Sequence, residues 1–205
     1  MRGVDDDASA DGTRGRILRA ARQVLAQRGL ATTVDHVAEA AGLSRRTVFR
    51  AFATRDRLIA EAVRDGIRSY AEHLPPSPTG GDLDSWLVAS MRAVHRLNAR
   101  HGRIYWELAG LGGELEGEIA AVAEERRAAR LELVAAFTRA VWRGAGGDDD
   151  PPGWLVDCCA VQLSAFSTRA LTGDFGRSAD EAADACARTL AAAARAAATE
   201  RVAAR

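Results

Sequence analysis

Four arginines stand close together in the segment AGLSRRTVFRAFATRD, which runs from Ala41 to Asp56. They are Arg45, Arg46, Arg50 and Arg55. A guanidinium group donates paired hydrogen bonds to a phosphate or to O6 and N7 of guanine, so this cluster is suited to contact with nucleic acid. Glycine ends helices and serine caps them, and the segment has Gly42 and Ser44 directly before its first arginine. It therefore predicts a turn followed by a positively charged helix.

The charge of the chain is unevenly distributed, although its formal total is zero. Residues 13–64 hold eleven arginines and four acidic residues, whereas residues 1–12 hold one arginine and four aspartates. Residues 65–205 hold sixteen arginines and twenty acidic residues, and the chain has no lysine. A basic module joined to an acidic remainder is expected where one part of a protein binds a polyanion, although a solvated helical surface would have the same composition.

The pattern of apolar residues predicts an all-α protein with an N-terminal helix-turn-helix. No segment alternates apolar and polar residues as a strand does, whereas apolar residues recur at helical spacing from Arg14 to Gln27 and from Val34 to Ala41. Two further helices follow Ser44 and Thr54, the residues expected to cap them, and Thr32 with Asp35 resembles a capping box for the second helix. A glycine-containing turn between the second and third helices predicts the motif.

In a helix-turn-helix the second helix of the pair enters the major groove, where its N-terminal residues meet base edges. We therefore expect Arg45 and Arg46 to contact both bases and phosphates. Arg50, about one turn further along, would reach the same groove. Ser44, Thr47 and Arg55 are placed for phosphate contacts.

Residues 14–63 resemble the DNA-binding domain of TetR-type transcriptional regulators. The resemblance runs through ILRAA, TTV, VAEAAGLS, RRTVFRAF and TRDRL, in order and in spacing. Phe49 stands where the family usually has tyrosine, so it either contacts DNA through its ring or only packs, and Arg55 stands where lysine is common. We expect a disordered acidic tail at residues 1–12, the DNA-binding domain at 13–64 and a regulatory and dimerisation domain at 65–205. The expected DNA-binding residues are Arg14, Thr33, Ser44, Arg45, Arg46, Thr47, Phe49, Arg50 and Arg55.

The second domain is expected to be helical, which gives about nine helices in all. A proline- and glycine-rich linker at 74–82 precedes predicted helices at 83–97, 103–111, 114–143, 154–171 and from Ser178 onward. Helix 154–171 has only two charged residues, so it is expected to be buried on more than one side, either by its own domain alone or also by a second subunit. The resemblance implies a dimer formed by the last two helices. The expected interface residues are Trp154, Leu155, Cys158, Phe166, Ala182, Cys186 and Leu190.

The resemblance also implies a repressor that binds a palindromic operator and is released by a small molecule bound in the second domain. The residues expected to line that site are Trp86, His95, Asn98, Tyr105, Trp106, Phe137, Trp142, Gln162 and Phe166. The alternative is a regulator without a small-molecule ligand, which is either controlled by a protein partner or constitutive.

A helical carrier or an enzyme is the alternative of a different class. The sequence contains no GxSxG, P-loop or HExxH pattern, so we assign no catalytic residue and expect no cofactor. His95 and His101 do not have the i, i+4 spacing of a metal-binding pair, and the three cysteines lack a CxxC pattern, so no metal ligand is assigned. No apolar tract approaches the roughly 20 residues of a membrane span, and we expect a cytoplasmic protein.

Overall fold

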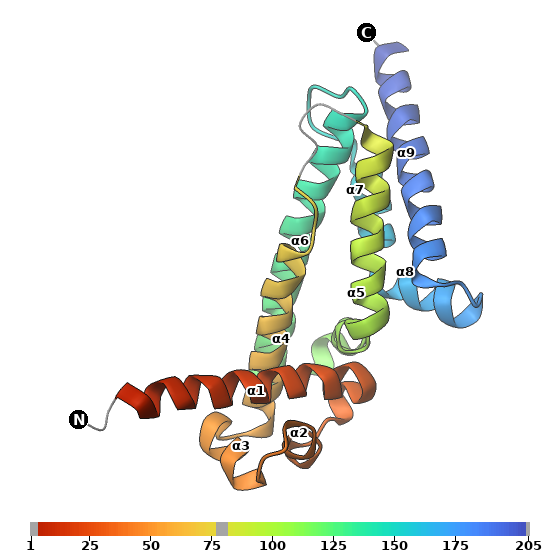
Figure 1. Cartoon of the computed structure of the whole chain (residues 1–205). Helices are drawn as coiled ribbons and strands as arrows, with labels where there is room; N and C mark the ends of the chain where they lie inside the picture. The colour runs from red at the N-terminus through yellow and green to blue at the C-terminus, as the bar shows by residue number, and fades with distance from the viewer. Residues whose placement is uncertain (1–3, 77–81, 204–205) are drawn as a thin grey trace. The chain divides into compact units, whose positions relative to one another are not determined.

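The computed structural model describes residues 4–76 and 82–203, which are helical throughout apart from short connections (Figure 1). No strand occurs in these residues, which confirms the predicted all-α class. The α-helices are α1 (Val4–Arg28), α2 (Val34–Ala41), α3 (Arg45–Phe52), α4 (Arg55–Glu72), α5 (Leu83–Leu111), α6 (Gly117–Gly144), α7 (Gly153–Gln162), α8 (Ala165–Arg169) and α9 (Ala179–Ala203). Three shorter helical segments are η1 (Gly29–Ala31), η2 (Gly112–Glu114) and η3 (Ala170–Asp174).

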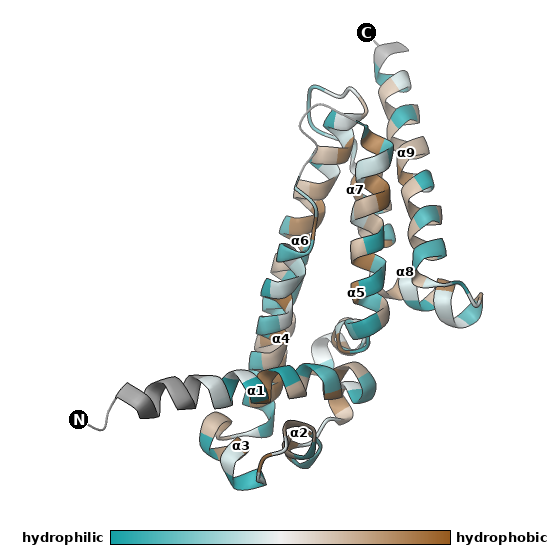
Figure 2. Cartoon of the chain, in the orientation of Figure 1, coloured by the Kyte–Doolittle hydropathy of each residue, from teal (hydrophilic) through white to brown (hydrophobic). Residues whose placement is uncertain are grey.

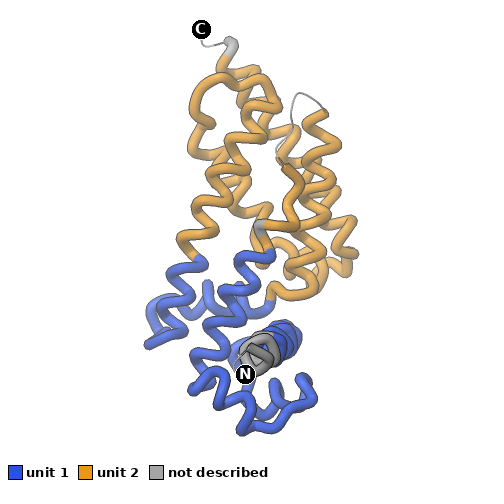
Figure 3. The backbone as a smooth tube through the Cα atoms, turned by 60° about the vertical axis from the view of Figure 1, so that its left-hand side comes forward, with its two compact units in different colours: residues 1–69, 103–126 blue, residues 70–102, 127–205 orange. Residues whose placement is uncertain are grey.

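The helices form two compact units (Figure 3). The first unit consists of Met1–Ser69 and Arg103–Arg126, and the second of Tyr70–Gly102 and Arg127–Arg205. The division therefore does not follow the order of the chain, because α4, α5 and α6 each contribute residues to both units. Helix α1 begins at Val4, inside the segment 1–12 for which we expected a tail.

The first unit is built on the apolar faces that the sequence predicts. Ile17 of α1, Val37 of α2, Phe52 of α3 and Leu58 of α4 are almost completely buried together. Ile104 of α5 joins the same core. Figure 2 shows hydrophilic and hydrophobic residues interspersed along α2 and α3.

Helix α5 is continuous over 29 residues, whereas we predicted two helical segments that end and begin on either side of Asn98–Gly102. A glycine in a helix costs only about 1 kcal/mol relative to alanine, so Gly102 does not end the helix. Its lack of a side chain is used in packing, because a Cβ atom added there would lie 3.2 Å from Cβ of Ala165.

We predicted one continuous helix over residues 154–171, and this prediction is wrong. Helix α7 ends at Gln162, and α8 begins at Ala165. Ser164 caps α8 by accepting a hydrogen bond from the backbone amide of Ser167 at 3.0 Å. A serine that competes for backbone hydrogen bonds in this way favours a helix start over a helix interior.

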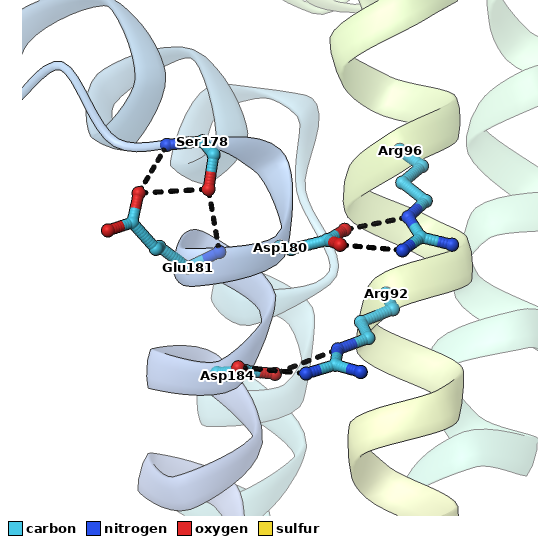
Figure 4. A network of polar contacts seen from close by, with 6 residues as sticks. All are labelled: Arg92, Arg96, Ser178, Asp180, Glu181 and Asp184. Atoms are coloured by element: carbon cyan, nitrogen blue, oxygen red, sulfur yellow. Dashed lines mark hydrogen bonds and ion pairs between the residues drawn. The ribbon is translucent and has the colours of Figure 1, made fainter.

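Two ion pairs fasten α9 to α5 in the second unit (Figure 4). Arg92 donates two hydrogen bonds of 3.0 Å to Asp184, and Arg96 donates two of 2.6 Å to Asp180. The hydrogen bonds from Arg96 lower the pKa of Asp180. Ser178, from which we expected the last helix to run, caps α9 by accepting a hydrogen bond from the backbone amide of Glu181 at 3.2 Å.

His95 of α5 is a fully buried polar residue in the second unit. Its Nδ1 atom and the hydroxyl of Thr168 share a hydrogen bond of 3.0 Å. Burial lowers the pKa of His95 to about 4, although the nearby backbone of Gln162 offsets part of the shift. The imidazole is therefore neutral at pH 7 in the folded protein.

We predict that His95→Leu removes part of the acid sensitivity of folding. Between pH 6.5 and 4 the unfolded histidine binds a proton that the folded one does not, so stability falls as the pH falls through this range. From pH 6.5 to pH 5 the wild type should lose about 2 kcal/mol more unfolding free energy than the variant, measured by urea unfolding at fixed protein concentration. Equal losses in the two proteins would show that His95 is not the group responsible.

Candidate nucleic-acid interface

The turn between α2 and α3 fixes the direction of α3. Gly42 ends α2 with φ 61° and ψ 40°, a left-handed conformation that strains any residue with a side chain. The backbone amide of Leu43 donates to the carbonyl of Ala38 at 2.9 Å, which closes the turn. Ser44 then caps α3 by accepting a hydrogen bond from the backbone amide of Thr47 at 3.1 Å. The predicted stop at Gly42 and the predicted cap at Ser44 are both confirmed.

Helix α3 has an apolar face and a basic face. Val48 and Phe52 are each 1% exposed and pack in the core of the first unit. Arg45, Arg46 and Arg50 are exposed on its other faces. Because the core fixes the inner face, the helix presents its arginines to solvent in a defined orientation.

The exposed arginines of α3 differ in their partners. In the described part of the chain, Arg46 and Arg50 make no hydrogen bond or ion pair, so all their donors are available. Arg45 forms an ion pair with Asp35 of α2 at 2.9 Å and lies 5.3 Å from the ring centre of Phe49. Phe49 is half-buried and packs against the core cluster.

Two arginines that we expected to contact DNA are occupied inside the first unit. Arg14 donates to the carbonyl of Ala51 at 2.8 Å, forms an ion pair with Glu61, and lies 4.4 Å from the ring centre of Phe52. Its contact with Ala51 therefore holds the C-terminal end of α3 against α1.

Arg55 holds the turn before α2. Its Nε atom donates to the carbonyl of Thr32 at 2.7 Å, its Nη2 atom donates to the carbonyl of Leu30, and its Nη1 atom pairs with Asp56 at 2.7 Å. These bonds connect the start of α4 to the segment that leads into α2.

The capping box of α2 is formed by Thr33 and His36, not by Thr32 and Asp35 as we predicted. The hydroxyl of Thr33 accepts from the backbone amide of His36 at 3.3 Å, and the His36 ring accepts from the amide of Thr33. The Thr32 hydroxyl instead donates to the carbonyl of Gly29 at 2.8 Å and is buried. Thr33 lies on the exposed side of the helix start.

Helix α5 supplies two residues to the first unit that sequence reasoning missed. Glu107 accepts a hydrogen bond from the backbone amide of Leu30 at 2.6 Å, and Arg103 donates to the carbonyl of Gln27. Arg103 and Glu107 also pair with each other at 2.9 Å. Their i, i+4 spacing was a visible signal of a charged pair, but the target of the pair lies about 77 residues earlier in the chain.

The residues predicted to line a ligand site fall in different units. Tyr105 and Trp106 belong to the first unit. The second unit contains the other seven, namely Trp86, His95, Asn98, Phe137, Trp142, Gln162 and Phe166. The structure brings some of these seven together.

One pair of these seven residues is in ring contact, and others bond to residues outside the set. The rings of Trp86 and Phe137 stack with centroids 5.0 Å apart, and Asn98 donates to the carbonyl of Leu163 at 3.4 Å. Trp142 is fully buried and donates to Asp149 at 3.2 Å, whereas the Phe166 side chain is 49% exposed. Phe166 therefore contributes to the surface of the unit.

The predicted interface residues differ in how far they are buried. Leu155, Ala182, Cys186 and Leu190 are buried within the single chain. Trp154 and Phe166 are exposed, and Cys158 is half-buried. Burial raises the pKa of Cys186 to about 11, so this thiol is uncharged at neutral pH.

The described residues contain neither a cluster of metal-binding side chains nor a membrane-spanning helix. No group of three or more His, Cys, Asp or Glu side chains there is arranged to hold a metal ion. Within the same residues, no helix is both long enough and apolar enough to cross a lipid bilayer.

A short basic helix held by an amphipathic three-helix scaffold, with a tight glycine turn before it, defines a DNA-binding protein of the helix-turn-helix class. Residues 17–62 match the family model described as bacterial regulatory proteins, tetR family. Residues 17–62 are therefore similar to this family of bacterial regulatory proteins.

Individual relatives are similar over different lengths. An uncharacterized HTH-type transcriptional regulator of Bacillus subtilis, YdeS, is 28% identical over 111 residues, and the match spans about half of each chain, 54% of both. The fold is shared with a tetR-family transcriptional regulator from Streptomyces coelicolor (TM-score 0.70, 20% identity, 95% of this chain and 86% of that one). It is also shared with a transcriptional regulator from Rhodococcus sp. Rha1 (TM-score 0.66, 20% identity, 89% of this chain and 97% of that one).

We predict that Arg55→Ala destabilises the protein, whereas Arg46→Ala does not. Loss of Arg55 leaves two backbone carbonyls without a charged donor, which should lower the free energy of unfolding by about 2–3 kcal/mol. Arg46 has no such partner, and its removal should change that free energy by less than about 0.5 kcal/mol. Chemical unfolding followed by circular dichroism measures both. A stable Arg55→Ala protein that binds DNA weakly would instead assign Arg55 to phosphate contact.

Proposed function

We propose that the chain binds a palindromic DNA operator as a homodimer, represses transcription there, and is released by a small molecule bound in the second unit. The observation that carries the DNA-binding part is the basic face of α3, on which Arg46 and Arg50 have no partner in the described residues. Exposed cations without local partners are suited to phosphate oxygens and guanine edges. Arg14 and Arg55 are assigned positioning roles, because their guanidinium groups are already bonded.

Ser44, Thr47 and Phe49 complete the proposed DNA contact. The hydroxyls of Ser44 and Thr47 lie 2.8 Å apart at the start of α3, where the helix N-terminus favours an anion. Thr33 lies at the start of α2 and offers a third hydroxyl at a helix N-terminus. We assign these three hydroxyls to phosphates and the Phe49 ring to packing beneath Arg45.

A dimer is supported by an exposed apolar stripe on α7. Trp154 is 43% and Val161 60% exposed, and together with Cys158 they recur at the i, i+4, i+7 spacing of one helix face. Phe166 of α8 is exposed as well. Two recognition helices about 34–36 Å apart would read successive major grooves, which a monomer does not do. Repression follows because a dimer on its operator excludes other proteins from the same DNA.

Release by a small molecule is supported by buried polar atoms of the second unit that lack a hydrogen-bond partner. Nε2 of His95 and the hydroxyl of Ser90 are buried and make no hydrogen bond of good geometry in the described residues, although the backbone of Gln162 lies close enough to His95 to raise its pKa. An unsatisfied buried polar atom costs about 1–3 kcal/mol, which a ligand with a matching polar group would recover. Because His95 is neutral at pH 7, it fits an uncharged ligand.

Helix α5 contributes residues to both units and could therefore transmit a change from a bound ligand to the DNA-binding helices. It carries His95 in the second unit, and in the first unit it carries Arg103 and Glu107, which hold the backbone around Gln27 and Leu30. We propose that a ligand at His95 shifts α5 and so changes the hydrogen bond between Glu107 and the backbone amide of Leu30. A ligand acts only through different affinities for two conformations, and we propose that the two differ in this hydrogen bond.

The function is tested by selection of binding sites from genomic DNA with the purified protein. A palindromic site is expected, and Arg45→Ala combined with Arg46→Ala should weaken binding to it about a hundredfold or more, because the change removes a base contact worth about 1–3 kcal/mol and a phosphate contact as well. The matched control is Arg139→Ala with Arg143→Ala, which removes two exposed arginines of the second unit. Undiminished operator binding by the α3 variant would refute the assignment of α3.

The same operator complex tests the ligand. Metabolite fractions are added to complexes of the wild type and of His95→Leu, and DNA release is measured by fluorescence anisotropy. A fraction that releases the wild type but not the variant supports the site at His95. No release by any fraction would favour the regulator without a small-molecule ligand.

We predict that Val161→Arg converts the dimer to a monomer without unfolding it, because a charge in the apolar stripe would be buried unpaired at the interface. Light scattering coupled to gel filtration measures the mass, and circular dichroism measures the helix content. Leu131→Arg is the matched control, since Leu131 is a leucine of α6 that is 61% exposed outside the stripe. A Val161→Arg protein that remains a dimer would place the interface elsewhere.

A further inference from the structure

Asp35 places a carboxylate directly beside the proposed DNA-reading helix. Helices α2 and α3 pack against each other in the first unit (Figure 1). Nη1 of Arg45 donates to both oxygens of Asp35, at 3.2 and 2.9 Å. The two side chains are 62% and 60% exposed, so this ion pair lies on the surface that would meet DNA.

A carboxylate in this position is unfavourable for binding to any DNA, because it repels phosphates. A surface salt bridge is worth only about 0–1 kcal/mol, so stability gives little reason for it. Asp35 does lie in the first turn of α2, where a negative charge interacts favourably with the helix dipole. That helix effect makes no use of Arg45, whereas the structure connects the two residues by two hydrogen bonds.

The ion pair changes what Arg45 is able to contact. The pair of Arg45 and Asp35 together has no net charge, so it attracts a phosphate more weakly than a lone guanidinium does and releases fewer counterions. Its remaining donors, on Nη2 and Nε, have no hydrogen-bond partner in the described residues. These donors still fit O6 and N7 of guanine, a contact that depends on hydrogen-bond geometry more than on charge.

The Phe49 ring restrains the same guanidinium from within α3. The carbon at the centre of the Arg45 guanidinium lies 5.3 Å from the centre of that ring. With Asp35 bonded to one nitrogen and Phe49 beneath, Arg45 is held by residues of two helices. Arg46 and Arg50 have neither restraint, which suits them to phosphates of any sequence.

We propose that Asp35 is a specificity-determining residue, which prevents Arg45 from binding phosphate and reserves it for a base edge. This inference rests on the proposed DNA binding and deepens it. It assigns sequence-independent affinity to Arg46 and Arg50, and sequence discrimination to the combination of Asp35, Arg45 and Phe49.

The test compares Asp35→Asn with Glu39→Gln. Both changes remove one exposed negative charge from α2, but only Asp35 is paired with Arg45. Affinity is measured by fluorescence anisotropy over a range of salt concentrations, for a duplex with the selected operator and for a duplex of the same length with that site scrambled. Asp35→Asn is also combined with Arg45→Ala, so that the contribution through Arg45 is isolated.

We expect Asp35→Asn to strengthen binding to the scrambled duplex about tenfold and to steepen its salt dependence by about one counterion, because Arg45 becomes free to bind phosphate. Operator affinity should change less, so the ratio of the two affinities falls. Glu39→Gln should raise both affinities equally and leave the ratio unchanged. In the Arg45→Ala background, Asp35→Asn should have no more effect than Glu39→Gln.

Three results would overturn the inference. If Asp35→Asn matches Glu39→Gln on both duplexes, the carboxylate acts only through its overall charge. If both affinities fall together with the urea midpoint of unfolding, Asp35 serves only to stabilise α2. A wild type that binds neither duplex would overturn the proposed function itself, a result that the variants' ratios cannot imitate.

Discussion

The whole arrangement depends on the burial of Val48 and Phe52, because α3 is too short to be stable by itself. Isolated helices of fewer than about 12–15 residues are marginal in water, and α3 has eight. Its stability therefore comes from the core of the first unit and from the cap at Ser44. Because packing rather than helix propensity supports α3, its outer face is free to carry three like charges that would weaken an independent helix.

The arginines of the first unit are chemically identical, so their surroundings alone separate their roles. Arg14 and Arg55 are bonded to backbone carbonyls that fix the scaffold, Arg45 is paired with a carboxylate, and Arg46 and Arg50 are unpaired in the described residues. Counting charges along the chain reveals a basic module but cannot make this division. The division matters because a guanidinium with satisfied donors gains little from a phosphate that would have to replace them.

Local signals made the helix-turn-helix predictable from sequence, since Gly42, Ser44 and the apolar spacing around Val48 act within a few residues. Tertiary contacts were not predictable in the same way. Arg55 reaches Leu30 across 25 residues, and Glu107 reaches it across 77. The break before Ser164 and the continuity of α5 through Gly102 were also missed. At Ser164 a local helix cap decides the break, whereas at Gly102 packing decides the outcome, through its close approach to Ala165.

The proposed regulation puts two kinds of polar group on one helix. In the second unit, His95 of α5 keeps a ring nitrogen without a hydrogen bond of good geometry in the described residues, at a cost to stability. In the first unit, Glu107 of the same helix accepts a hydrogen bond from the backbone amide of Leu30. In the proposed regulation, a ligand that bonds to His95 would recover that cost. The continuous helix has a role beyond packing in this proposal, because it carries both His95 and the residues Arg103 and Glu107, which contact the backbone before α2.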